Sequence, residues 1–140
     1  MTTAAISHGK QLKVLNISLW TVQALLAAMF GMAGISKATR PIAELAPQIP
    51  WTAEMSEGLV RFIGVSELAG AVGLLLPALT RVRPGLTPLA AAGLVTVMTL
   101  AAAFHATRGE LGGIVVNVVL GGLAAFIAWG RYKKVPIEPR

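Results

Sequence analysis

Four long runs of apolar residues dominate the sequence. They cover residues 17–35, 59–79, 86–104 and 111–129. A helix needs roughly 20 apolar residues to cross the hydrocarbon core of a bilayer, and each run has about that length. Helices satisfy every backbone hydrogen bond within their own segment, as lipid requires, and uninterrupted runs of this kind are typical of them. The pattern therefore predicts an all-α fold with four transmembrane helices.

The connections between these runs predict how the helices are arranged. Residues 80–85 and 105–110 form short turns, which place successive helices antiparallel. Residues 36–58 form one longer connection, and its three prolines exclude a continuous helix there. We expect an antiparallel up-down bundle with both termini on one side, and a long connection that lies over the membrane surface as a lid.

Composition agrees with a membrane protein. The 140 residues are 55% hydrophobic and 13% charged, with a mean hydropathy of +0.71. The predicted organisation is a basic N-terminal segment (1–15), a four-helix membrane domain (16–132) and a C-terminal tail (133–140). The chain contains no cysteine, which excludes a dithiol relay, a thiolate metal site and a disulfide.

Lys and Arg are unevenly distributed between the two predicted sides. One side carries Lys10, Lys13, Arg81, Arg83, Arg131, Lys133, Lys134 and Arg140. The other side carries Lys37, Arg40, Arg61 and Arg108. Because Lys and Arg concentrate in cytoplasmic segments, we expect a multi-pass protein of the cell (inner) membrane with both termini cytoplasmic. Topology explains the net charge of +6, and no basic face with interleaved aromatics indicates nucleic acid as a partner.

The ionisable residues within the apolar runs are the candidates for chemistry. An ionised side chain costs about 2.5–3.5 kcal/mol at the centre of a membrane helix, so each one needs a partner or a function. Glu67 lies about 12 Å below the Leu59 end of its helix, too deep for a short carboxylate to reach water. The predicted topology gathers one polar group in the outer half of the bundle: Lys37, Arg61, Glu67, His105, Arg108, Glu110 and Asn117.

Two interpretations of the central residues remain open. Glu67 is either buried in an ion pair with Arg61 or Arg108, or it binds a ligand or handles a proton. His105 is either structural or a proton shuttle, since histidine titrates near neutral pH.

The amides Gln23 and Asn117 also allow two interpretations. Each lies in a stripe of small residues at i+4 spacing, which is typical of closely packed membrane helices with hydrogen bonds between them. The alternative is that they belong to the ligand site. No residues have the spacing of a metal site, and a haem held by two histidines is disfavoured because His8 and His105 lie at opposite ends.

Several segments, taken in order, resemble a family of small membrane proteins. They are Phe30 to Lys37, Arg61 to Ala71, Leu76 to Arg81, Pro88 to Ala91 and Phe104 to Glu110, followed by Asn117. From about Leu19 to Tyr132 the chain resembles the DoxX-like family. The resemblance implies a four-helix membrane bundle in which Lys37, Glu67 and residues 104–110 are shared polar positions. The family takes its name from a membrane subunit of a thiosulfate:quinone oxidoreductase, and other relatives resemble partners of redox enzymes or chaperone-like membrane proteins, so the resemblance implies a redox link or a chaperone role.

The leading hypothesis is a site for a lipophilic small molecule, such as a quinone, in the outer half of the bundle. Glu67 and His105 are the predicted proton-moving residues. The predicted ligand-binding residues are Lys37, Arg61, Arg108, Glu110, Asn117 and Gln23. Electrons would come from a membrane or peripheral redox partner, since the sequence shows no cofactor motif. The alternatives are a cofactor-free isomerase or cyclase acting on a lipophilic substrate, and a non-enzymatic scaffold or chaperone; a homo-oligomer is compatible with each.

Overall fold

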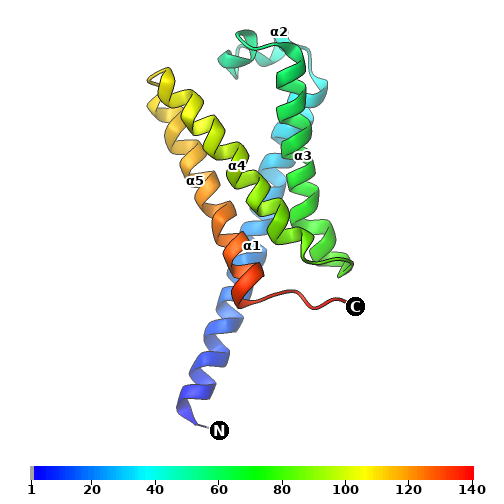
Figure 1. The fold of residues 1–140 in the computed structure, drawn as a ribbon, viewed down its shortest axis with the longest axis vertical. Coiled ribbons are helices and arrows are strands. Elements are labelled where there is room, and N and C mark those ends of the chain that lie inside the picture. Colours follow the sequence, from blue (N-terminus) through cyan, green and yellow to red (C-terminus); the bar gives the residue numbers. More distant parts are fainter. Residues whose placement is uncertain (1) are drawn as a thin grey trace.

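The computed structural model describes residues 2–140, so Met1 of the predicted N-terminal segment lies outside the described residues. The long helices are α1 (Thr3–Thr39), α3 (Glu57–Thr80), α4 (Leu86–Thr107) and α5 (Leu111–Trp129). The short elements are the helix α2 (Ile42–Leu45), the 3₁₀ turn η1 (Pro50–Ala53) and the π-helical turn η2 (Gly130–Lys134). Successive long helices run in opposite directions in Figure 1, and both termini lie toward the same end. We call this the tail end, and the opposite end, which carries α2 and η1, the loop end. The loop is the connection between α1 and α3, residues 40–56.

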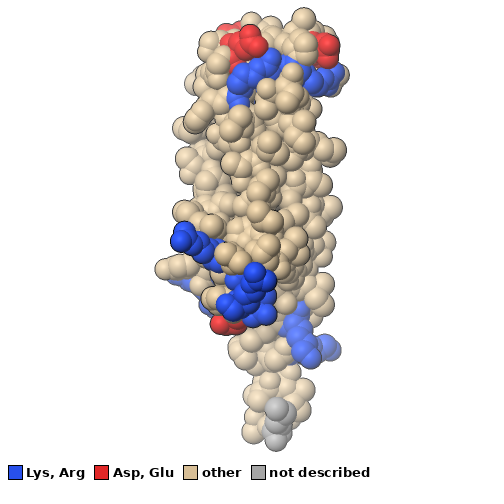
Figure 2. Space-filling model, turned by 90° about the vertical axis from the view of Figure 1, so that its right-hand side faces the viewer, with Lys and Arg blue, Asp and Glu red and all other residues tan. Residues whose placement is uncertain are grey.

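All four long helices are long and apolar enough to cross a membrane. Their outward faces carry large apolar side chains such as Met32, Leu100 and Leu111, which are 67%, 67% and 72% exposed. Figure 2 shows Lys, Arg and Glu gathered toward the two ends, with an uncharged belt between them. Such a belt is unfavourable in water and matches the interior of a bilayer. The predicted all-α fold with four membrane-spanning helices is confirmed.

Helix α1 is much longer than the apolar run that predicted it. It begins at Thr3, whereas the run begins at residue 17. Its 37 residues span about 55 Å, against roughly 30 Å for the hydrocarbon core. Figure 1 shows the N-terminal part of α1 projecting beyond the other helices at the tail end. The basic N-terminal segment is therefore a continuation of the first membrane helix.

The long helices pack as two pairs. Helix α1 packs chiefly against α3, and α4 packs chiefly against α5. The pairs meet through a core of Leu26 and Phe30 from α1, Leu74 from α3, Leu94 from α4 and Ile127 from α5, all at most 2% exposed. Toward the loop end the pairs diverge (Figure 1). This divergence makes room for the candidate site.

Two glycines allow α1 and α3 to touch along their backbones. A Cβ atom on Gly34 would lie 2.7 Å from the carbonyl oxygen of Gly64 and 2.7 Å from the amide nitrogen of Leu68. A Cβ atom on Gly64 would likewise lie 2.7 Å from the amide nitrogen of Ala38. Small residues at such crossings let membrane helices approach closely, which fixes the register of side chains nearby.

We expect Gly34→Ala to lower the free energy of unfolding by about 1–3 kcal/mol, because the added methyl group meets backbone atoms that cannot rotate away. The control is Gly93→Ala in α4, where a Cβ atom meets nothing within 4 Å. Reversible unfolding in mixed micelles measures both variants. Equal stabilities of the two variants would contradict the close backbone contact.

Candidate functional site

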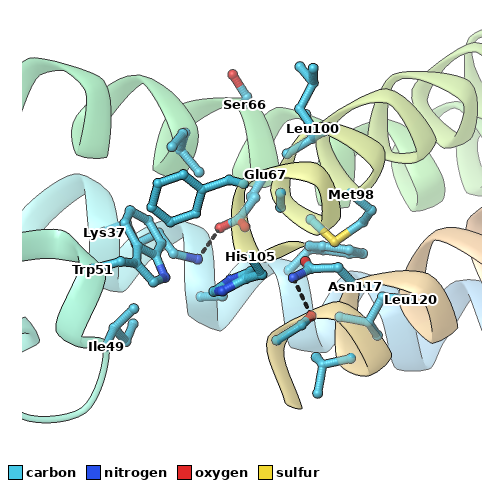
Figure 3. A pocket seen from close by; sticks show the side chains of 18 of the residues that line it. Lys37, Ile49, Trp51, Ser66, Glu67, Met98, Leu100, His105, Asn117 and Leu120 are labelled. Carbon is cyan, nitrogen blue, oxygen red and sulfur yellow. Dashed lines mark hydrogen bonds and ion pairs between the residues drawn. The ribbon is translucent and has the colours of Figure 1, made fainter. Parts of the chain in front are cut away.

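The divergence of the helix pairs leaves a cavity of about 610 Å³ at the loop end. All four long helices contribute to its wall, and the loop adds Ile49, Trp51 and Met55. Most of the wall is apolar, and the polar side chains on it are Lys37, Ser66, Glu67, His105 and Asn117 (Figure 3). An apolar space with a few polar groups is typical of a small-molecule site.

Lys37 and Glu67 form a buried ion pair between α1 and α3. Lys37 Nζ donates to Glu67 Oε2 at 2.6 Å, and the two side chains are only 9% and 6% exposed. The interpretation that paired Glu67 with Arg61 or Arg108 was wrong about the partner, because the glycine contact brings the end of α1 against this turn of α3. Within residues 2–140, Glu67 Oε1 accepts no hydrogen bond. This oxygen can therefore accept one from a molecule in the cavity.

Arg61 supports this pair from outside the cavity. Its Nη1 donates to the carbonyl oxygens of Lys37 and Arg40, at 2.7 and 2.6 Å, and its Nη2 donates to Glu57. The last carbonyls of a helix have no partner within the helix, and Arg61 satisfies two of them at the end of α1. The side chain does not line the cavity. The structure thus places Arg61 as a cap that anchors Lys37, and not at the predicted ligand site.

His105 reaches the cavity from the last turn of α4. Its Nδ1 lies 2.6 Å from Glu110 Oε2, and its side chain is 14% exposed. The ring fits against α5 because residue 113 is glycine: a Cβ atom there would lie 2.5 Å from the imidazole Cγ and Nδ1. Figure 3 shows His105 between the Lys37–Glu67 pair and Asn117. The predicted proton-handling residues therefore share one cavity.

Arg108 joins the loop to the turn between α4 and α5. Its Nη1 and Nη2 donate to the two carboxylate oxygens of Glu54, and its Nε donates to Glu110 Oε1 at 2.7 Å. These hydrogen bonds from Arg108 lower the pKa of Glu54 and the pKa of Glu110, and His105 adds to the effect at Glu110. Both carboxylates are thus ionised at neutral pH. Arg108 and Glu110 lie behind His105 and do not line the cavity themselves.

Asn117 lies on the cavity wall, two turns along α5. Its Nδ2 donates to the carbonyl oxygen of Gly113 in its own helix at 2.7 Å. No hydrogen bond to its Oδ1 comes from the part of the chain that the structure describes. The amide therefore presents an acceptor to the cavity.

Gln23 does not belong to this site. Its Nε2 donates to the carbonyl oxygen of Leu74, and its Oε1 accepts from Arg131 Nε at 2.6 Å. Arg131 is 3% exposed, donates also to Asn16, and lies over the ring of Trp20. Gln23 is 0% exposed and links α1, α3 and η2, as in the interpretation of a hydrogen bond between packed helices, and it does not line the cavity.

Four further residues were not predicted as members of the site: Trp51, Phe104, Gly113 and Glu54. Trp51 and Phe104 line the cavity and pack edge to face, with ring centroids 6.5 Å apart. The contact of Glu54 has no local sequence signal, since its partner Arg108 is 54 positions away. Residues 2–140 hold no group of three or more His and Glu side chains arranged for a metal ion.

The fold and the site define a class: a small multi-pass membrane protein with a largely apolar cavity at one end of a four-helix arrangement. A sequence model of the DoxX-like family matches residues 21–127, most of the chain. The protein belongs to the DoxX-like family. Comparison with curated proteins and with solved structures gives no match.

The buried ion pair predicts strong coupling between Lys37 and Glu67. Removal of one partner leaves the other charge buried and unpaired, so Lys37→Met should lower the free energy of unfolding by about 3–5 kcal/mol. The double variant Lys37→Met/Glu67→Leu should be more stable than Lys37→Met alone. A double-mutant cycle in mixed micelles measures this coupling, and strictly additive effects would contradict the pair.

The contact between Glu54 and Arg108 predicts that acid releases the loop. Because the pKa of Glu54 is lowered in the folded protein, the contact is fully present above the ordinary pKa of glutamate, about 4.3, and is lost as pH falls below that range. The cysteine-free chain accepts spin labels at Gln48→Cys and Leu111→Cys. The distribution of distances between the labels should stay narrow from neutral pH to about pH 5 and broaden in stronger acid.

Glu54→Gln should broaden this distance distribution already at neutral pH. Glu44→Gln, a change at an exposed position of the same loop, should leave the distribution narrow. A distance that stays narrow in Glu54→Gln at every pH would exclude the ion pair as the contact that holds the loop.

Proposed function

We propose that this DoxX-like protein binds a lipophilic small molecule of the quinone class in the cavity at the loop end, as the membrane part of a redox system. The observation that carries the proposal is the combination of a mostly apolar wall with an ion pair and a histidine on it. The head of a quinone needs hydrogen-bond donors for its carbonyl oxygens and a group that exchanges protons. Lys37 supplies the donor, and His105 and Glu67 supply the proton-exchanging groups.

The size and the surroundings of the cavity support a ligand that comes from the bilayer. Its wall includes Phe62 on α3 and Leu100 on α4, which are 68% and 67% exposed on the face that meets lipid. On the other side it includes Met29 of α1 and Val116 of α5, which are 47% and 55% exposed. A volume of about 610 Å³ suits a ring-shaped head with the first part of an apolar tail. The remainder of the tail would lie in the gap between the helix pairs.

In this proposal the electrons come from a partner protein, and this chain supplies the ligand site. Lys37 holds the oxygen of the head, where its ammonium stabilises a developing negative charge. The Trp51 and Phe104 rings hold the plane of the head and exclude water. A cofactor-free isomerase or cyclase would use the same groups on another lipophilic substrate.

The test is native mass spectrometry of the protein in nanodiscs prepared from its own membranes. The wild-type protein should carry a bound lipophilic species. In Glu67→Gln and His105→Ala the affinity for this species should fall at least about tenfold, the effect of one hydrogen bond to a charged group. The controls are Glu44→Gln and His8→Ala, which change the same residue types at exposed positions away from the cavity.

The identity of the released species separates the candidates. A quinone supports the redox proposal, and another lipophilic molecule favours the isomerase or cyclase. Absence of any bound species, with unchanged cellular activity of Glu67→Gln and His105→Ala, would contradict a ligand site and favour the scaffold.

A further inference from the structure

His105 faces two different environments through its two ring nitrogens. Nδ1 is 2.6 Å from Glu110 Oε2. Nε2 makes no hydrogen bond within residues 2–140, and the ring lines the cavity. One nitrogen is thus held by the protein, and the other is available to a ligand.

The state of Glu110 decides which nitrogen carries the proton. An ionised carboxylate only accepts hydrogen bonds, so the Nδ1 opposite it must be the donor. Arg108 keeps Glu110 in this ionised form, because it donates to Oε1 and lowers the pKa of the carboxyl group. In the neutral ring Nε2 is then left without a hydrogen and can accept one from a molecule in the cavity that the ring lines. The same division of roles orients the histidine of a catalytic triad, where the carboxylate remains ionised.

Glu110 is in turn tied to the loop. Arg108 donates from Nε to Glu110 and from Nη1 and Nη2 to Glu54, so one guanidinium fixes both carboxylates. The ring of Phe104 lies 5.3 Å from the Arg108 guanidinium carbon and packs against Trp51 of the loop. Displacement of the loop therefore removes the hydrogen bonds from Arg108 to Glu54 and the packing of Trp51 on Phe104, and both help to hold Arg108 against Glu110.

We propose that Glu110 is a positioning residue that fixes the tautomer of His105, so that Nε2 acts as the proton acceptor for a ligand hydroxyl group, and that Glu54 makes this arrangement depend on the closed loop. The inference rests on the proposed function for the nature of the ligand. It assigns a base, an orienting carboxylate and a loop contact to one chain of hydrogen bonds.

The proton transfer balances without any further reagent. The O–H bond of the ligand breaks, its proton forms a bond to His105 Nε2, and the electron pair remains on the ligand oxygen. The resulting imidazolium faces the Glu110 carboxylate, while the Lys37 ammonium, itself paired with Glu67, is the cation on the cavity wall that stabilises the ligand oxyanion. The reverse transfer returns the proton to the ligand.

The test is nitrogen NMR of the full chain in nanodiscs, labelled with ¹⁵N at the histidine rings. The chain has only two histidines, and the exposed His8 serves as the reference for a free ring in the same spectrum. Spectra are recorded at a pH high enough that both rings are neutral. His105 in the wild-type protein should show the Nδ1–H form in excess of about tenfold, as expected for a hydrogen bond to a charged acceptor.

Two variants and a control separate the roles. Glu110→Gln should abolish the excess and give His105 the mixture of tautomers seen for His8. Glu54→Gln should reduce the excess, and Glu44→Gln should leave it unchanged. Thermal unfolding of each variant verifies that the helices remain intact, which we expect because Glu54 and Glu110 lie outside the membrane-spanning helices.

Each outcome decides the inference. An Nε2–H form in the wild-type protein, or the same tautomer in wild type and Glu110→Gln, overturns the role of Glu110, and an excess unaffected by Glu54→Gln overturns the dependence on the loop. Native mass spectrometry of the same samples tests the proposed function separately. A fixed tautomer without any bound lipophilic species overturns that function while it supports Glu110 as the residue that positions His105.

Discussion

The ion pair between Lys37 and Glu67 is the interaction on which the loop end of the molecule depends. A carboxylate at this depth in α3 has neither water nor a headgroup to solvate it, so the neighbouring helix must supply a cation at bonding distance. The two charged groups lie 2.6 Å apart beside a close contact of the helix backbones, which glycine at positions 34 and 64 permits. Arg61 then satisfies carbonyl groups at the end of α1, which would otherwise face lipid without partners. The ion pair, the backbone contact at the two glycines and the hydrogen bonds of Arg61 thus all hold α1 against α3.

The second pair of helices is attached differently. At the loop end, α4 and α5 approach the first pair mainly through side chains of the loop, where Glu54 binds Arg108 and Trp51 packs on Phe104. These contacts are polar or aromatic, partly exposed, and drawn from a segment without a long helix of its own. The cavity therefore lies between two units that are each well packed, and the loop is the connection that varies most easily. Loops with few buried apolar contacts open at low cost compared with a packed helix pair.

Much of the architecture could be predicted from the sequence, because an apolar run of about 20 residues can cross a bilayer only as a helix that satisfies its own backbone hydrogen bonds. The same pattern also predicted that Lys37, Glu67, His105 and Asn117 lie at one end, since depth along a helix follows from residue count. Depth also separates Gln23 from this group, because Gln23 lies 14 residues before Lys37, about 21 Å toward the tail end at 1.5 Å per residue. Depth does not determine the face of a helix, and Arg131 illustrates this limit: the sequence grouped it with the tail-side charges Lys133 and Lys134, yet its side chain is buried against Gln23 from the π-helical turn η2. The partner of Glu54 depends on two hairpins meeting in space, and no local pattern records that meeting.

The point at which α3 and α4 cross gives the molecule a mechanical property. Gly70 and Gly73 of α3 lie against Leu94 and Ala90 of α4, so closely that a Cβ atom on either glycine would be 2.5 Å from these side chains. This crossing lies toward the tail end, and the two helices separate from there toward the loop end (Figure 1). The packing at this crossing therefore sets the angle between α3 and α4, and this angle sets the width of the cavity at the loop end. A small change in side-chain size at the crossing produces a larger displacement at the far ends of the helices. Residues remote from Glu67 and His105 thus help to determine how large a molecule the cavity can hold.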